Sequence, residues 1–354
     1  MKKLLCVLAA LTLLGCATAE VNIPEGTTEI GKHAFADCEE LTGPLTLPDG
    51  LVSIGERAFA GCEEITGYLV IPDSVVFIGK YAFDSCYGLN GSLMLPSGLT
   101  AIEDGVFNGC YGLSGKLSLP SGLTHIGYEA FRDCAGFTGG LTIPIGVTEI
   151  SDYAFASCWS FDGKLVLGNQ VKSIGYKSFR ECGFTGSLDL PPSLASIGAG
   201  AFHSCAGFTG DLIIPEGVTE IRAETFGWCT GFNGKLGLPD SITAIGNEAF
   251  WGCSGFTGQL VLPKKLNSIN LFAFAGCRGF TGTLVIPEGV TKIGENAFED
   301  CTGLTEVILP ESLTDMHATA FQDCSSALFF RVVEGSYAHT WCVENGVSYE
   351  FYTP

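Results

Sequence analysis

The sequence predicts a repeat solenoid of short parallel strands and turns, capped at its C-terminus by a small helix and strand. A cysteine recurs thirteen times; ten of the twelve intervals between successive cysteines are 24 residues and two are 23. A Phe stands three residues before each of these cysteines, and a Leu-x-Ile-Pro-like stretch follows most of them. A fixed period of this size indicates units that cannot bury their own apolar face and therefore stack on their neighbours. The ladder cysteines are Cys38, Cys62, Cys86, Cys110, Cys134, Cys158, Cys182, Cys205, Cys229, Cys253, Cys277, Cys301 and Cys324.

Residues 1–19 have the pattern of a signal segment. Two lysines precede an apolar stretch that is shorter than the roughly 20 residues needed to span a bilayer. Two endings are compatible with it. Leu-Leu-Gly before Cys16 resembles a bacterial lipobox, in which the Cys16 thiol is lipidated, and Ala-Thr-Ala before Glu20 resembles an ordinary signal-peptidase site. Both predict an exported protein, either a lipoprotein of the cell surface or outer membrane or a secreted chain.

Residues 20–328 are predicted to form the thirteen repeats of 23–24 residues. In each, Gly-x-Leu-x-Ile-Pro alternates with period two and so predicts a short strand with Leu and Ile inward, as at Leu69 and Ile71. The Pro ends that strand because it has no N–H to donate. Val-Thr-x-Ile-Gly predicts a second extended stretch on the opposite side, and Ala-Phe-x-x-Cys predicts a single helical or 3₁₀ turn.

Residues 329–354 are predicted to form the C-terminal cap. Residues 336–345 read as a helix that begins after the N-cap Ser336 and ends before Gly346, and 347–352 alternate like a final strand. No matching N-terminal cap is visible, because the stretch from Val21 to Pro24 already has the pattern of a repeat strand. Its edge is therefore predicted to be open to the membrane, a partner or a second copy of the chain.

The formal charge of −20 opposes binding to nucleic acid and to anionic lipid. It is compatible with a basic partner, although a solvated acidic surface is the simpler interpretation. Contact with a membrane is predicted only through the lipid on Cys16.

The constant phase of the ladder cysteines predicts small buried thiols that donate to loop carbonyls. Sporadic disulfides between neighbouring rungs are the alternative. Cys342 is out of phase and is predicted to be the most exposed thiol. No Cys-x-x-Cys, His-Glu-x-x-His, Gly-x-Ser-x-Gly or phosphate-cradling glycine loop occurs, so no catalytic residue, metal site or cofactor is expected and the chain is not predicted to be an enzyme.

The repeated phrase Ile-Gly-x-x-Ala-Phe-x-x-Cys, followed by Leu-x-Ile-Pro, resembles the BspA-like, spirochaete-type leucine-rich repeats. Residues 335–346 also resemble the tail of that family, so the resemblance covers residues 21–354. The 24-residue unit with its Phe-Thr-Gly insert departs from the commoner unit of 23. The resemblance implies a curved leucine-rich-repeat solenoid and a surface-exposed protein-binding role, with host matrix proteins or other microbial cells as ligands of proposed adhesins. It implies no catalytic residues.

Two surfaces are candidates for binding, the outward strand face and the aromatic flank, and the contact region is predicted in the N-terminal half. Outward positions of the repeat strands carry many small and β-branched residues and, on the same face, Lys116, Lys164 and Lys235. The position directly after the ladder cysteine carries large aromatic residues in three units, which are typical interface anchors. Strand propensity and padding of the loop flank are the simpler explanations. The outward strand positions also form an interrupted apolar row: Val70, Met94, Val166, Ile213, Val261 and Val285. The predicted contact residues are Tyr68, Tyr87, Tyr111, Lys116, Trp159 and Lys164.

Adhesin-like capture of a host or microbial protein is the function that these observations favour. A structural protein that self-associates through the N-terminal edge is one alternative. A carbohydrate-binding module that uses the aromatic flank is another.

Overall fold

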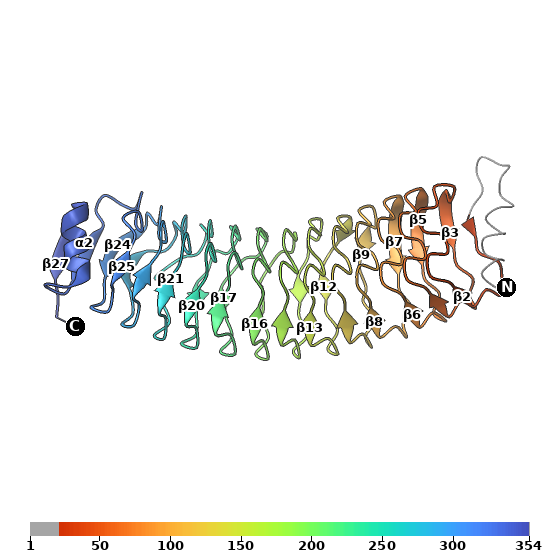
Figure 1. The fold of residues 1–354 in the computed structure, drawn as a ribbon, viewed down its shortest axis with the longest axis horizontal. Helices are drawn as coiled ribbons and strands as arrows, with labels where there is room; N and C mark the ends of the chain where they lie inside the picture. The colour runs from red at the N-terminus through yellow and green to blue at the C-terminus, as the bar shows by residue number, and fades with distance from the viewer. Residues whose placement is uncertain (1–20, 354) are drawn as a thin grey trace. The chain divides into compact units, whose positions relative to one another are not determined.

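The computed structural model describes residues 21–353, which form two compact units. Unit 1 comprises residues 21–171 and Glu181–Phe184, and unit 2 comprises Lys172–Arg180 and residues 185–353. In both units each repeat is one rung of a parallel-strand solenoid, which confirms the predicted fold class (Figure 1). The signal segment 1–19 and Cys16 lie outside the described residues.

Two lines of strands run through unit 1. Strands of the first line lie at or just before the Leu of the Leu-x-Ile stretches, and they end before the Ile. Strands of the second line are the last two residues of the Thr-x-Ile stretches. First-line strands are β1 (Val21–Asn22), β3 (Gly43–Thr46), β5 (Ile65–Val70), β7 (Leu89–Met94), β9 (Gly115–Lys116), β11 (Phe137–Thr138), β12 (Leu141–Thr142) and β14 (Leu165–Val166). Second-line strands are β2 (Glu29–Ile30), β4 (Ser53–Ile54), β6 (Phe77–Ile78), β8 (Ala101–Ile102), β10 (His125–Ile126) and β13 (Glu149–Ile150).

Unit 2 repeats this arrangement. Its first-line strands are β17 (Leu212–Ile213), β19 (Leu236–Gly237), β22 (Gly282–Val285), β24 (Leu304–Ile308), β26 (Phe329–Val332) and β27 (Tyr349–Phe351). Its second-line strands are β15 (Ser173–Ile174), β16 (Ser196–Ile197), β18 (Glu220–Ile221), β20 (Ala244–Ile245), β21 (Ser268–Ile269), β23 (Lys292–Ile293) and β25 (Asp315–Met316).

The register between strands of neighbouring rungs pairs residues that occupy the same position in the repeat. Leu69 pairs with Leu93 and Leu212 pairs with Leu236, so the inward Leu of one rung lies on the inward Leu of the next. Because the side-chain period of a strand is two, this register keeps one face of every strand in the core. Short strands suffice because each gains its hydrogen bonds and its apolar contacts from the rung beside it.

Stacked phenylalanines fill the core. From Phe35 to Phe155 in unit 1, successive ring centroids are 5.2–5.7 Å apart with interplanar angles of 7–16°. From Phe179 to Phe321 in unit 2 the corresponding ranges are 5.0–5.6 Å and 3–9°. The Phe of the Phe-Thr-Gly insert forms a second buried stack, exemplified by Phe232 and Phe256 at 5.2 Å.

The Ala-Phe-x-x-Cys segment is not a helical turn, so that prediction was wrong. In the second rung the amides of Arg57, Phe59 and Gly61 donate to carbonyls of the next rung over 2.8–2.9 Å. The two amides between them donate to the carbonyl three residues earlier over 3.2–3.3 Å. The residue before the ladder cysteine has a positive φ in all thirteen rungs, and so does the fifth residue before it in twelve. Left-handed residues at two positions cannot continue a helix, and they free alternate amides for the neighbouring rung.

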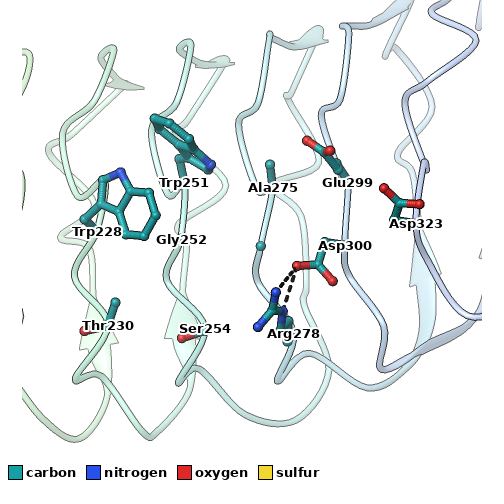
Figure 2. Close-up of a pocket in the computed structure, with 11 residues that line it drawn as sticks. Trp228, Thr230, Trp251, Gly252, Ser254, Ala275, Arg278, Glu299, Asp300 and Asp323 are labelled. Carbon is teal, nitrogen blue, oxygen red and sulfur yellow. Dashed lines mark hydrogen bonds and ion pairs between the residues drawn. The ribbon is translucent and has the colours of Figure 1, made fainter.

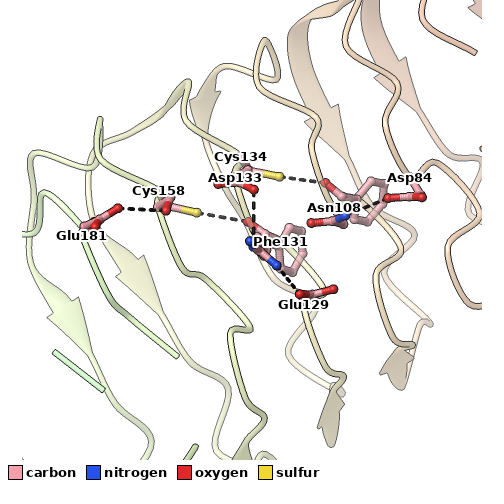
Figure 3. Close-up of polar contacts among 11 residues, drawn as sticks. Asp84, Asn108, Glu129, Phe131, Asp133, Cys134, Cys158 and Glu181 are labelled. Carbon is pink, nitrogen blue, oxygen red and sulfur yellow. Dashed lines mark hydrogen bonds and ion pairs between the residues drawn. The ribbon is translucent and has the colours of Figure 1, made fainter. Parts of the chain in front are cut away.

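Hydrogen bonds from the ladder cysteines, which we name the thiol ladder, link successive rungs. In twelve successive rungs the cysteine Sγ donates to the Phe carbonyl of the preceding rung, as Cys134 does to Phe107 and Cys158 to Phe131 at 3.1 and 3.2 Å (Figure 3). The other ten bonds span 2.9–3.2 Å. The fourteen cysteines of residues 21–353 are thiols, in agreement with the buried-thiol interpretation.

The C-terminal elements match their prediction. Helix α2 (Tyr337–Asn345) begins after Ser336, whose side chain accepts a hydrogen bond from the His339 amide, and ends at Gly346, which is left-handed at φ 65°. Cys342 is fully buried on this helix, so the prediction that it is the most exposed thiol was wrong. Burial raises the pKa of its thiol to about 12. The more accessible thiols are Cys38 and Cys324, at the two ends of the ladder.

Candidate functional site

All six predicted contact residues lie in unit 1, where they occupy two repeat positions. Three follow a ladder cysteine directly and form what we name the aromatic column: Tyr87, Tyr111 and Trp159. The other three occupy one outward position beside the inward Leu of the first strand line: Tyr68, Lys116 and Lys164. All six side chains are exposed.

The local fold explains why the aromatic column points outward. Gly112 follows Tyr111, and a Cβ at Gly112 would lie only 2.4 Å from the Leu89 carbonyl oxygen of the preceding rung. The backbone is therefore pressed against its neighbour immediately after the column position. The side chain before that contact is directed to solvent, and 46% of Tyr111 and 42% of Tyr87 are exposed.

Tyr87 and Tyr111 form the one direct ring contact within the predicted set. Their centroids are 5.4 Å apart and their planes are inclined by 26°. A Cβ at Gly109 would lie 3.3 Å from a ring carbon of Tyr87, so the absence of a side chain at Gly109 makes room for that ring. Stacked rings are held in place before any partner binds, so less side-chain freedom is lost on binding.

Charged groups flank this pair. Burial raises the pKa of the Tyr111 phenol, and the carboxylate of Asp133 adds to that rise while Arg132 opposes it. Arg132 forms an ion pair with Glu129 and another with Asp133, the latter at 3.4 Å. Burial also raises the pKa of Asp133. The stacked tyrosines therefore lie beside a network of ion pairs that contains positive and negative side chains.

The six predicted contact residues do not form one continuous patch. Buried Ala135 occupies the column position between Tyr111 and Trp159, so Trp159 stands two rungs from Tyr111, with one rung between them. Tyr68, Lys116 and Lys164 are likewise interrupted by Ser92 and Gly140. The outward apolar row is exposed as expected, with exposed fractions of 37–65% over both units.

Sequence reasoning missed a groove in unit 2, which we name the tryptophan groove. It has a volume of about 520 Å³, and Trp228 and Trp251 lie on neighbouring rungs at one end of it (Figure 2). Arg278, Glu299 and Asp323 lie toward the other end. Its remaining lining residues are Thr230, Gly252, Ser254, Ala275, Gly276 and Asp300.

One signal in the sequence pointed to this groove. Trp228 stands directly before a ladder cysteine, a position that elsewhere holds Asp, Gly, Ser or Glu. That position is left-handed in every rung, and Trp228 adopts a φ of 60° there. A bulky residue in this conformation is unusual. The sequence alone did not show that the position has a positive φ.

The buried thiols are poor nucleophiles, because burial raises their pKa, to about 12 for Cys62 and Cys253. Within residues 21–353, no group of three or more His, Cys, Asp and Glu side chains is arranged to hold a metal ion. The same residues contain no helix that is both long and apolar enough to cross a bilayer. The chemistry offered by the exposed sites is stacking, hydrogen bonding and ion pairing.

Comparison with known proteins agrees with this architecture. A family model described as the BspA type leucine rich repeat region (6 copies) matches residues 12–138, 115–233 and 232–333. No curated protein matches the chain. The solved structure of a leucine rich cell surface protein from Faecalibacterium prausnitzii A2-165 is 27% identical with a TM-score of 0.54, over 84% of this chain and 86% of that chain.

Two further solved structures are similar at lower TM-scores. The leucine-rich repeat protein of T. pallidum is 32% identical over 44% of this chain and 70% of its own, with a TM-score of 0.38. A leucine-rich repeat protein from Bacteroides ovatus ATCC 8483 is 22% identical over 96% of this chain and 100% of its own, with a TM-score of 0.40.

Proposed function

The chain belongs to the BspA-type leucine-rich repeat family, and from this premise we propose that it is an adhesin-like, surface-exposed protein-binding module. The family points to protein interaction or a surface role in general. Its solenoid fold is typically non-enzymatic, and we propose that this chain follows that rule. The ligand class that we propose is an extracellular-matrix protein of a host or a surface protein of another cell.

The observation that carries this proposal is the stacked pair Tyr87 and Tyr111 in the aromatic column. Exposed tyrosine and tryptophan side chains are enriched among residues that dominate binding energy. Here two of them are ordered by each other, and Trp159 repeats the same position two rungs on. Tyr68, Lys116 and Lys164 extend the proposed contact region along the strand position.

A binding assay with matched variants tests the placement. Purified extracellular-matrix proteins are immobilised one by one, and the mature chain is compared with Tyr87→Ala/Tyr111→Ala and with Phe77→Ala. Phe77 is the control because it is an exposed aromatic residue of unit 1 on the second strand line. We expect capture by at least one matrix protein and a loss of about tenfold or more in the tyrosine variant only. Equal effects of both variants would reject the placement of the site, and no capture by any matrix protein would reject matrix proteins as the ligand class.

Export and anchoring belong to the same proposal. The similar protein from Faecalibacterium prausnitzii is described as a cell surface protein, which supports an exported location. We propose that residues 1–19 direct export, that residues 20–328 are the repeats and 329–354 the cap, and that Cys16 carries the lipid. An intact mass of residues 16–354 plus acyl chains, measured on protein from the native membrane fraction, is the expected result. A lipid-free mass that begins at Glu20 would contradict the anchor.

A further inference from the structure

The tryptophan groove extends over five rungs of unit 2, from Trp228 to Asp323, and its two ends differ in chemistry (Figure 2). With rungs roughly 4.8 Å apart, its lining residues span about 19 Å. That is the length of an extended peptide of about six residues. The groove is separate from the aromatic column, which lies in unit 1.

The aromatic end exposes indole surface at a conformational cost. Trp228 is 42% exposed, and its ring centroid lies 5.1 Å from that of Trp251 with the planes inclined by 59°. A Cβ at Gly252 would lie 2.9 Å from the Trp228 ring, so that indole covers the bare glycine backbone. The rungs before and after it show that small or acidic residues satisfy this left-handed position. A strained bulky residue in a groove is a reason to look for a ligand.

The other end of the groove is negatively charged. Asp300 is neutralised by Arg278, whose Nε and Nη2 lie 2.7 and 2.6 Å from one carboxylate oxygen. Glu299 accepts a hydrogen bond from Asn296 and Asp323 accepts one from Gln322, at 2.8 and 3.3 Å. Across the described residues neither Glu299 nor Asp323 has an ion-pair partner. Two carboxylates therefore remain to meet a cation.

The floor between the two ends carries only small residues. Ala275 and Gly276 present no side chain larger than a methyl group. A peptide backbone can therefore lie close to the solenoid between the indoles and the carboxylates. Trp251 and Glu299 are two rungs apart, about 10 Å, which is about three residues of extended chain.

We propose that the tryptophan groove binds an extended segment of a partner protein that carries lysine or arginine side chains about three residues apart. One cation packs against the faces of Trp228 and Trp251, where the electron-rich indole attracts positive charge. The other pairs with Glu299 and Asp323. Charge complementarity selects this occupant, because a neutral sugar could stack on the indoles but would leave both carboxylates without a cation.

The test uses the full mature chain and a synthetic eight-residue peptide that has two lysines three positions apart. Its counterpart has glutamine in place of both lysines, and maltohexaose serves as a neutral sugar probe. Titration calorimetry at low salt measures each affinity. We expect the lysine peptide to bind about tenfold or more tightly than the glutamine peptide and maltohexaose not to bind. Equal affinity for the two peptides overturns the proposal, and binding of maltohexaose that requires Trp228 makes the groove a carbohydrate site instead.

Variants separate this site from the general acidity of the chain. We expect Glu299→Gln/Asp323→Asn to weaken the lysine peptide about tenfold at low salt. The control Glu216→Gln/Glu311→Gln removes the same two charges from exposed positions outside the groove and should change affinity less than twofold. Equal losses in the two double variants would mean non-specific attraction and would overturn the proposal.

The variant Trp228→Gly tests the role of the indole without a loss of folding. Other rungs place Gly61, Gly109, Gly252 and Gly276 at this left-handed position, so the substitution should leave the unfolding temperature unchanged or raise it. It should nevertheless weaken the lysine peptide about fivefold or more. Unchanged affinity in this folded variant would overturn the role of the indoles.

Discussion

The ladder cysteine combines a small apolar volume with a hydrogen-bond donor. The Phe59 carbonyl accepts the amide of its own Cys62 at 3.1 Å and the thiol of Cys86, one rung on, also at 3.1 Å. A smaller apolar residue such as alanine would fill less of this space and would leave the carbonyl with one donor. Repetition in every rung therefore reflects packing and hydrogen bonding rather than disulfide formation.

Thiol reactivity should follow position in the ladder. At pH 8, a thiol-specific alkylating reagent should modify Cys38 and Cys324 first, because only these two ladder thiols are partly accessible. Cys110 and Cys342 are fully buried, and burial raises the pKa of both, so they should react only after unfolding. Peptide mapping by mass spectrometry measures each site. Labelling of Cys110 in the native protein as fast as that of Cys38 would contradict the thiol ladder.

Glu306 should make stability depend on pH. The hydrogen bond from Thr283, at 2.6 Å, and the ion pair with Arg331 lower the pKa of Glu306 from its ordinary value of 4.5. A carboxyl whose pKa is lower in the folded state stabilises the protein above the unfolded pKa, and that contribution is lost as the pH falls through the folded pKa. We expect Glu306→Gln to lower the free energy of unfolding by about 1–2 kcal/mol at pH 7.

Denaturant titrations of the wild type and Glu306→Gln from pH 7 to pH 3 measure this dependence. The difference between them should hold down to about pH 5 and shrink at lower pH. Thr283→Val keeps a side chain of similar shape but removes the hydrogen bond, so it should reduce the same pH dependence. A difference as large at pH 3 as at pH 7 would contradict the assignment.

At the scale of the element, the turn segment is the part that the sequence predicted least well. The strands could be predicted because residues such as Leu69 and Ile71 alternate with outward residues. The helix could be predicted because Ser336 and Gly346 are typical cap residues at its two ends. The left-handed conformation could not be predicted from the sequence, because most rungs carry a residue other than glycine at the positions of Arg57 and Trp228. Packing between rungs imposes their left-handed conformation, and the backbone preferences of these residue types do not indicate it.

The glycine after the aromatic column offers a test of this packing. A Cβ at Gly112 would lie 2.4 Å from the Leu89 carbonyl oxygen, which belongs to the backbone and cannot rotate away. We expect Gly112→Ala to lower the free energy of unfolding by about 2–3 kcal/mol. Gly122→Ala is the matched control ten residues on, where nothing lies within 4 Å, and it should change stability by less than about 0.5 kcal/mol. Equal unfolding midpoints for the two variants would contradict the close stacking.

Both surfaces were only partly predictable for the same reason. The aromatic column uses one repeat position, so Tyr87, Tyr111 and Trp159 could be found by aligning the repeats. The tryptophan groove combines residues before and after the ladder cysteine on five rungs, and their alignment depends on the turn geometry. The burial of Cys342 was missed because it depends on how α2 packs against β26 rather than on its phase.

At the scale of the whole molecule, each rung interacts with the rungs beside it. The thiol bonds span 26 or 27 residues, and ion pairs such as Lys32 with Glu56 and Lys80 with Asp104 span 24. Stability should therefore be transmitted between neighbours within each unit rather than shared evenly. The net charge of −20 leaves carboxylates on the surface to meet basic partners.

A core substitution should loosen the solenoid locally. Phe250 is fully buried and stacks on Phe226 and Phe274 at 5.6 and 5.3 Å, so Phe250→Ala should cost about 3–5 kcal/mol. Hydrogen exchange should speed up most in the rungs of these three residues and least in α2. The exposed Phe77→Ala serves as the control with little change. A uniform loss of protection over all residues of unit 2 would refute nearest-neighbour coupling.

We propose that the outward aromatic column binds protein while the repeated positions build the scaffold. The most direct test replaces Tyr111 with the photoreactive amino acid benzoyl-phenylalanine, and Phe77 with the same group in a parallel variant. Each is irradiated with the panel of extracellular-matrix proteins, and adducts are identified by mass spectrometry. The account predicts a specific adduct from position 111 and none from position 77. No adduct from position 111, or equal adducts from both, would contradict it.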